Sequence, residues 1–208
     1  MTYLKDPAAI YERSFAIVRG EADLSDLPAS IEPVAVRLMH ACGMTDLVAD
    51  LRFDDRVVGA AAGALSTGCA ILADCEMARR AIIETALPAG NGIVCTLNDA
   101  AVPELARAGG TTRSAAAVSL WSAHLDGAVV VIGNAPTALF ALLELIDQGA
   151  PKPAAILGFP VGFVGAAESK QDLADNPRGI PFITLLGRRG GSAMAGAALN
   201  AIALGMGS

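Results

Sequence analysis

Five short apolar segments recur along the chain, and each is followed by a turn and then by a stretch with helical spacing. The segments are "CAILAD" (69–74), "GIVCTL" (92–97), "GAVVVIG" (127–133), "AAILGF" (154–159) and "PFITLLG" (181–187). Short segments that are apolar throughout are typical of strands buried on both faces, and intervening helices let such strands run parallel. The pattern predicts an α/β fold with a mainly parallel, doubly wound (Rossmann-like) sheet and helices on both faces.

Helical patterns fill the gaps between these segments. They cover residues 75–87, 98–125 with a break at "GGTT", 135–148, 165–175 and 191–205. A composition of 53% hydrophobic and 17% charged residues provides for a large buried core. Because no linker or repeat divides the chain, residues 1–208 are expected to form a single α/β domain.

The N-terminal third is predicted to be helical. "KDPAAIYERSFAIVRGEADL" (5–24) begins with Asp6 as a cap. "SIEPVAVRLMHACG" (30–43) has Ser30 as a cap and Gly43 as a stop. We therefore expect a helical N-terminal segment of two helices ahead of the sheet.

Arg37 and His40 lie three positions apart in the second of these helices and so share a face. The pair could be an anion clamp beside a general acid, or an ordinary surface pair on an amphipathic helix, and spacing alone favours the surface pair. The chain has only two histidines, and we assign the other, His124 in "SLWSAHLDG", to structure.

The segment "GGTTRSAAAV" (109–118) places a threonine cap ahead of Arg113 and Ser114 in the first turn of a helix, where backbone donors favour negative charge. Anion binding and simple capping explain it equally well. Ligands of parallel sheets bind beyond the carboxyl ends of the strands, where this chain has the Gly-rich loops 160–165 and 187–196. Their N–H groups could receive an anion, although the glycines of "GRRGGSAMAG" (187–196) fit a tightly packed helix better.

No other familiar motif indicates the chemistry. The sequence has no P-loop, no G-x-G-x-x-G, no Ser-His-Asp or Cys-His order and no clustered metal ligands. Its net charge of −6 argues against a nucleic-acid partner. We therefore expect neither cofactor nor metal, and a reaction that needs little more than a positioned acid and a shaped pocket.

Neither membrane insertion nor secretion is expected. The uncharged run "GAVVVIGNAPTALFALL" (127–143) approaches membrane-spanning length, but Gly133, Asn134 and Pro136 interrupt it. A strand, a turn and a helix explain it better. The four cysteines match neither C-x-x-C nor a zinc site, and no secretory leader is found, which favours a cytoplasmic protein.

Several longer motifs resemble those of the precorrin-8X methylmutase family. They are "DPAAIYERSFAIVRGEADL", "VAVRLMHACGM", "GGTTRSAAAV", "GNAPTALFALLELI" and "GFPVGFVGAAESK", and the resemblance runs from about residue 3 to residue 205. It implies an isomerase of cobalamin (corrin) biosynthesis that moves a methyl group from C-11 to C-12 of precorrin-8X. The product is hydrogenobyrinic acid, or cobyrinic acid in the cobalt-containing branch. The resemblance also implies a homodimer with its site near the subunit interface.

The resemblance assigns roles to five residues. The catalytic histidine of the family falls on His40, and its substrate contacts fall on Ser14, Arg37, Arg113 and Ser114. A methyl shift needs only a substrate held in the right geometry and protonation state. His40 would donate a proton or a strong hydrogen bond to the macrocycle, while the arginines would bind carboxylates of the anionic tetrapyrrole.

Two other functions remain open at this stage. A non-catalytic carrier of an anionic tetrapyrrole would use the same anion contacts but would not need His40. A Rossmann-type oxidoreductase is disfavoured because the dinucleotide fingerprint is absent. Whether the substrate contains cobalt, and whether product is handed over directly to the next enzyme of the pathway, also remain open.

Overall fold

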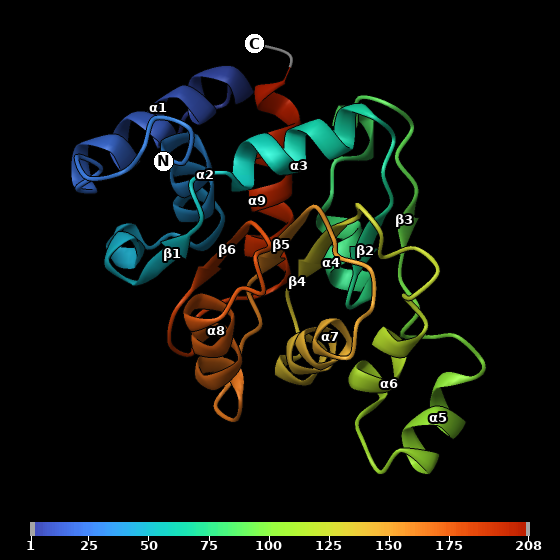
Figure 1. The fold of residues 1–208 in the computed structure, drawn as a ribbon. Helices are drawn as coiled ribbons and strands as arrows, with labels where there is room; N and C mark the ends of the chain where they lie inside the picture. The colour runs from blue at the N-terminus through green and yellow to red at the C-terminus, as the bar shows by residue number, and fades with distance from the viewer. Residues whose placement is uncertain (1–2, 207–208) are drawn as a thin grey trace.

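A six-stranded sheet runs through residues 3–206, the part of the chain that this computed structural model describes (Figure 1). The strands are β1 (Leu51–Phe53), β2 (Ile71–Ala73), β3 (Ile93–Val94), β4 (Val129–Ile132), β5 (Ala155–Gly158) and β6 (Phe182–Leu185). Their order is β1-β6-β5-β4-β2-β3, with β1 antiparallel to β6 and every other pair parallel. The five predicted strands are confirmed, and the parallel ones follow a doubly wound order.

Nine helices and two 3₁₀ segments surround this sheet within the described residues. The helices are α1 (Pro7–Glu21), α2 (Glu32–Cys42), α3 (Val57–Ser66), α4 (Glu76–Ala81), α5 (Val102–Ala108), α6 (Arg113–Ser119), α7 (Pro136–Asp147), α8 (Ala166–Asp175) and α9 (Ser192–Gly205). The 3₁₀ segments are η1 (Thr45–Asp50) and η2 (Glu84–Ala86).

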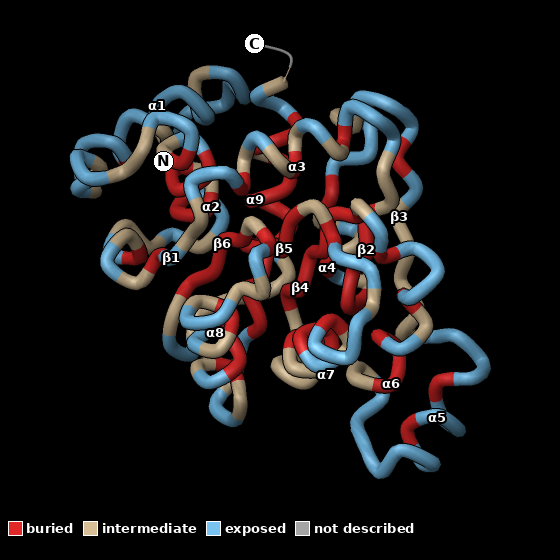
Figure 2. Tube along the Cα trace, in the orientation of Figure 1, coloured by how far each residue is buried: buried red, intermediate tan, exposed pale blue. Residues whose placement is uncertain are grey.

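The sheet separates two hydrophobic cores because side chains alternate along each strand. Val129 and Val131 of β4 face the core shared with α2, α3 and α9, whereas Val130 and Ile132 face the core shared with α7 and α8. Figure 2 shows the four central strands β2, β4, β5 and β6 buried and most of α1 exposed, because α1 packs on α2 rather than on the sheet. The expected helices on both faces are thus confirmed.

Four local predictions differ from the structure. The helical pattern expected over 75–87 forms only the short helix α4 and the separate 3₁₀ segment η2. The antiparallel strand β1 was not expected, because three residues with the charged Arg52 at their centre carry no strand pattern. Ser30 does not cap α2, which begins after Ile31 without a side-chain cap. The segment 98–125 forms the short helices α5 and α6, and a turn follows α6 through His124.

The apolar run 127–143 divides as expected into β4, a tight turn and α7, which begins with Pro136. Within residues 3–206 no helix has both the length and the apolar character needed to span a membrane.

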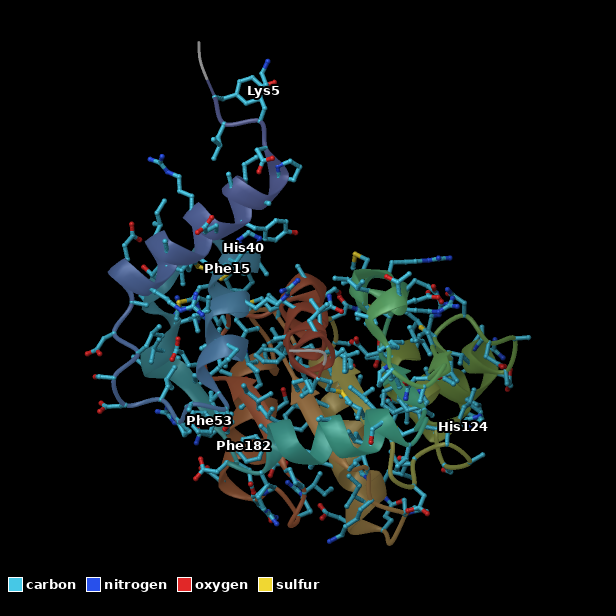
Figure 3. All side chains as sticks on the ribbon, turned by 90° about the horizontal axis from the view of Figure 1, so that it is seen from above. Lys5, Phe15, His40, Phe53, His124 and Phe182 are labelled. Atoms are coloured by element: carbon cyan, nitrogen blue, oxygen red, sulfur yellow. The ribbon has the colours of Figure 1, made fainter. Side chains whose placement is uncertain are left out.

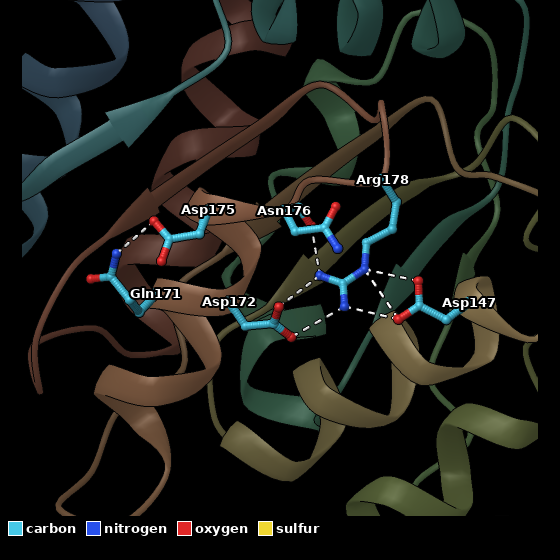
Figure 4. A network of polar contacts seen from close by, with 6 residues as sticks. All are labelled: Asp147, Gln171, Asp172, Asp175, Asn176 and Arg178. Atoms are coloured by element: carbon cyan, nitrogen blue, oxygen red, sulfur yellow. Dashed lines mark hydrogen bonds and ion pairs between the residues drawn. The ribbon is translucent and has the colours of Figure 1, made fainter.

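Arg178 ties the two helices of the second face together (Figure 4). Its guanidinium donates to both carboxylate oxygens of Asp147 in α7 and of Asp172 in α8, and also to the carbonyl oxygen of Asn176. These bonds lower the pKa of the Asp147 carboxyl. One arginine therefore fixes the ends of two helices that the chain connects only through β5.

Asp74 closes the point at which the winding of the sheet reverses, between β2 and β4. Its buried carboxylate accepts N–H groups of Gly133, Asn134 and Ala135, each at 2.9 Å. Burial raises the pKa of Asp74, and the three N–H bonds act in the opposite direction. These three N–H groups of the turn ahead of α7 are therefore already occupied, so an external anion does not find them free.

Replacing Asp74 with Asn should lower the free energy of unfolding by about 1–3 kcal/mol, because an amide nitrogen would face backbone donors that need an acceptor. Urea unfolding of the variant measures this loss. An unchanged midpoint would show that these three bonds contribute little to the fold.

Candidate functional site

His40 lies in the last turn of α2, with its imidazole exposed. Gly43 ends the helix in the left-handed conformation, with φ of 70°, and its N–H bonds to the Met39 carbonyl oxygen. The neighbours Leu38 and Met39 are buried in the core. The helix is therefore anchored on its inner face while His40 projects outward.

Ser14 of α1 holds the imidazole. Its Oγ lies 2.8 Å from Nδ1 of His40. In the protonated imidazolium Nδ1–H donates to this hydroxyl oxygen, and Nε2–H is left to meet a ligand. The contact joins residues that are 26 positions apart, and it gives the imidazole a defined orientation.

Two aromatic rings of α1 support the imidazole. The ring centroids of Tyr11 and Phe15 lie 5.3 Å and 5.2 Å from that of His40, and Phe15 meets it edge to face. Figure 3 shows His40 next to Phe15, and His124 on the opposite side of the molecule. Packing and a hydrogen bond together restrict the motion of His40.

A hollow of about 400 Å³ opens between α1 and α2 beside His40. Its wall is mainly apolar, and its polar side chains include the cation Arg13, the hydroxyl groups of Ser14 and Thr45, and the carboxylate of Glu21. The apolar lining consists of Leu4, Ile10, Ile17, Val18 and Met39. An apolar hollow with a few convergent polar groups is typical of a ligand site.

Arg37 lies one turn earlier on α2 but lines a different hollow, together with Phe15, Arg19 and Leu204. Phe15 borders this hollow and also contacts the His40 ring, so it lies between the two side chains. Within residues 3–206 the guanidinium of Arg37 forms no hydrogen bond or ion pair. The two residues share a helix but not one hollow.

Arg113 and Ser114 lie in the first turn of α6, far from α1 and α2 in Figure 1. Thr112 is the N-cap and its hydroxyl oxygen accepts the Ala115 N–H, so the expected threonine cap is confirmed. Nη2 of Arg113 donates to the Leu97 carbonyl oxygen at 3.1 Å, and its Nε and Nη1 make no hydrogen bond to residues 3–206. One copy of the chain therefore does not bring Arg113 to His40.

The end of α2 that carries His40 and the start of α6 that carries Arg113 nevertheless both lie at the carboxyl edge of the parallel strands. Met44, just beyond α2, shares a hollow with 161–163 and 188–190, which follow β5 and β6. Arg113 contacts the loop that follows β3. The candidate residues thus occupy two ends of the edge where ligands of such sheets bind.

Comparisons with known proteins assign the family. A family model described as "Precorrin-8X methylmutase" matches residues 9–204. The chain belongs to the precorrin-8X methylmutase family.

Related proteins that match nearly the whole chain agree with this assignment. It is 58% identical over 201 residues to a precorrin-8X methylmutase of Pseudomonas aeruginosa, and the match covers 97% of each chain. It is 56% identical to one from Sinorhizobium sp, covering 97% of this chain and 96% of the relative. A crystal structure of precorrin-8X methylmutase from Thermus thermophilus superposes with a TM-score of 0.84 at 41% identity, covering 94% of each chain.

Membership makes the chain an intramolecular methyl-transferring isomerase of cobalamin biosynthesis. Sequence reasoning about this methylmutase singled out Ser14 on α1 but missed Tyr11, Arg13 and Phe15. The helical spacing of "YERSF" could have indicated Tyr11 and Phe15, because residues three or four positions apart lie on one face of a helix and Tyr11 is separated by three and four positions from Ser14 and Phe15. Tyr11, Ser14 and Phe15 all contact His40, which only the packing of α1 on α2 reveals.

A buried lysine supports the loop after β6 in this methylmutase. Lys170 of α8 is fully buried, and its Nζ donates to the Arg189 carbonyl oxygen at 2.5 Å. Burial lowers the pKa of Lys170 to about 8, although Asp50 attracts the charge and opposes the shift. The guanidinium of Arg189 in turn binds Asp46 and Asp50 of η1, the segment that follows the His40 helix.

The stability of the protein should rise with pH between about 8 and 10.5, the folded and ordinary pKa values of Lys170. In this range the unfolded chain binds the proton and the folded chain does not, which contributes up to about 1.4 kcal/mol per pH unit. Urea unfolding at both ends of the range tests this. Lys170→Met should remove the rise, and an identical slope in the variant would assign the pH dependence to other groups.

Proposed function

We propose that this chain is a precorrin-8X methylmutase that moves a methyl group from C-11 to C-12 of the macrocycle and gives hydrogenobyrinic acid. The observation that carries the proposal is the Ser14–His40 pair, which opens onto an apolar hollow in a member of this family. The hollow suits part of a large organic ligand, and the pair supplies a positioned acid.

His40 acts as the acid of this reaction. Nδ1 is held by Ser14, so the proton that reaches the substrate is the one on Nε2. Substrate and product are isomers, so a proton donated to the macrocycle must return before release, and His40 is regenerated. The methyl group moves within one molecule, and the side chains of α1 and α2 need only hold the macrocycle and exclude water.

The natural substrate is proposed to be free of cobalt. Relatives named precorrin-8X methylmutase are 58% and 56% identical to this chain. Relatives named cobalt-precorrin-8 methylmutase, from Priestia megaterium and Salmonella typhimurium, are each 35% identical. The higher similarity supports the metal-free form.

A homodimer would bring Arg113 and Ser114 of one copy to His40 of the other. Three observations support this arrangement. Arg113 has free donors and lies far from His40 within one copy. α1 also leaves Ile10, Tyr11 and Ile17 half exposed beside the hollow, which is unusual for a free surface.

Mixing two inactive variants tests the shared site. If His40 and Arg113 act across the interface, His40→Ala and Arg113→Ala subunits should regain about one quarter of the parent activity after exchange, because half of the dimers are mixed and each contains one intact site. A mixture that stays inactive while mass measurement proves exchange would contradict a site shared between two copies.

Replacing His40 with Ala should lower the methyl-shift rate by about 10²- to 10⁴-fold, the usual contribution of a general acid. Binding should change much less, so the variant should still alter the absorption spectrum of added substrate. His124→Ala is the matched control, because this histidine is also exposed and lies on the opposite side of the molecule.

The same experiment separates the enzyme from a tetrapyrrole carrier. A parent protein that shifts the spectrum without forming a new product would be a carrier. A folded His40→Ala variant with the parent rate would remove the catalytic role of this histidine while leaving the reaction itself intact.

A further inference from the structure

The loop after β5 exposes an unusual group of apolar side chains. Phe163 is 85% exposed and Val164 is 88% exposed, and Val161 next to them is also exposed. Together with Met44 and the loop 188–190, Val161 and Phe163 border a hollow of about 290 Å³. An apolar patch of this kind on a protein surface usually marks a binding site.

The loop after β6 contains two adjacent arginines, Arg188 and Arg189, whose surroundings differ. Arg189 is committed to structure, because its guanidinium binds Asp46 at 2.8 Å and Asp50 at 2.7 Å, and its carbonyl oxygen accepts Nζ of Lys170. Arg188 is exposed, and no carboxylate within residues 3–206 pairs with it. Its guanidinium carbon lies 5.4 Å from the centroid of the Phe163 ring.

The backbone around Arg188 is fixed on several sides. Its carbonyl oxygen accepts the Gly162 N–H, and the Gly191 N–H bonds to the carbonyl oxygen of Phe159. Gly190 approaches the Phe159 and Pro160 carbonyl oxygens so closely that a Cβ atom would collide with them. The loop therefore presents an unpaired guanidinium from a rigid base, as a preorganised anion contact requires.

We propose that this hollow is a second binding region for the anionic tetrapyrrole, in which Arg188 binds a carboxylate of the macrocycle and Phe163 supports its apolar part. The inference rests on the proposed function and adds a residue that determines affinity. Arg188 is a binding residue, and the methyl shift itself stays with His40.

Position and charge favour the tetrapyrrole as the occupant. Gly43 and Thr45 line the hollow beside His40, and Met44 between them lines the second hollow, so the two adjoin across one short segment. On the other side of Thr45 lies an acidic hollow with Glu21, Asp23, Asp26 and Asp46. Carboxylates of a polyanion are repelled from that side and attracted to Arg188.

Titration with hydrogenobyrinic acid, followed by its absorption, tests the proposal. Arg188→Gln should weaken binding about tenfold, equivalent to about 1.4 kcal/mol, and should raise KM by a similar factor with little change in kcat. Arg56→Gln is the matched control, since it also removes one exposed arginine but lies near the start of β6, at the opposite edge of the sheet. A fully esterified corrin, which lacks the carboxylates, should bind the parent and Arg188→Gln equally.

The possible outcomes are distinct. Parent affinity in Arg188→Gln, with the parent enzyme active, would overturn this inference and leave the proposed function standing. A parent chain that neither binds nor converts the macrocycle would contradict the proposed function and this inference together. Phe163→Ser should weaken corrin binding without changing the molecular mass in light scattering, whereas a changed mass with unchanged affinity would show that the patch contacts a second copy instead.

Discussion

α9 packs so closely on the turn after β4 and on α4 that two positions of the contact have room only for glycine. A Cβ atom on Gly133 would lie 2.6 Å from Cα of Ser192, and one on Gly196 would lie 2.5 Å from Cβ of Ala81. The side-chain amide of Asn200 binds the end of α4, because its oxygen accepts the Ile83 N–H and its nitrogen donates to the Ala81 carbonyl oxygen. The small residues of α9 therefore serve helix packing, which fits the tightly packed helix expected for the end of the Gly-rich segment 187–196, whereas its other glycines lie in the loop ahead of α9.

Because α9 lies against the sheet, it offers a surface on which α2 packs, and α1 covers α2 in turn. This layering carries His40 to the exterior at the carboxyl edge, where α1 adds Ser14 and two aromatic rings. The other candidate cation, Arg113, reaches the same edge beyond β3. In the proposed homodimer, a large substrate with carboxylates on its rim would meet His40 of one copy and Arg113 of the other.

The sequence predicted the parts of the fold that depend on local pattern. The five parallel strands were found because each is apolar throughout, and Gly43 was recognised as a stop because a left-handed residue there favours glycine. β1 was not predicted, because it is defined by its pairing with β6, which lies in a distant part of the chain. In the site, the spacing of Arg37 and His40 suggested a common face, but Phe15 from another helix separates them. Spacing does not predict the Ser14–His40 bond, and only the family resemblance named both residues as part of the site.

We propose that His40, held by Ser14, promotes a methyl shift within a single tetrapyrrole. A single-turnover reaction with substrate carrying a carbon-13 label in the C-11 methyl group tests this most directly, followed by carbon NMR of the product. The label should appear at C-12 with the parent enzyme, and His40→Ala should bind the substrate but leave the label at C-11 over the same time. When the labelled substrate also carries nitrogen-15 in its ring and is mixed with unlabelled substrate, the two labels should stay together in the same product molecules. A label that stays at C-11 with the parent enzyme, or that reaches C-12 equally fast in the His40→Ala variant, would contradict the proposal.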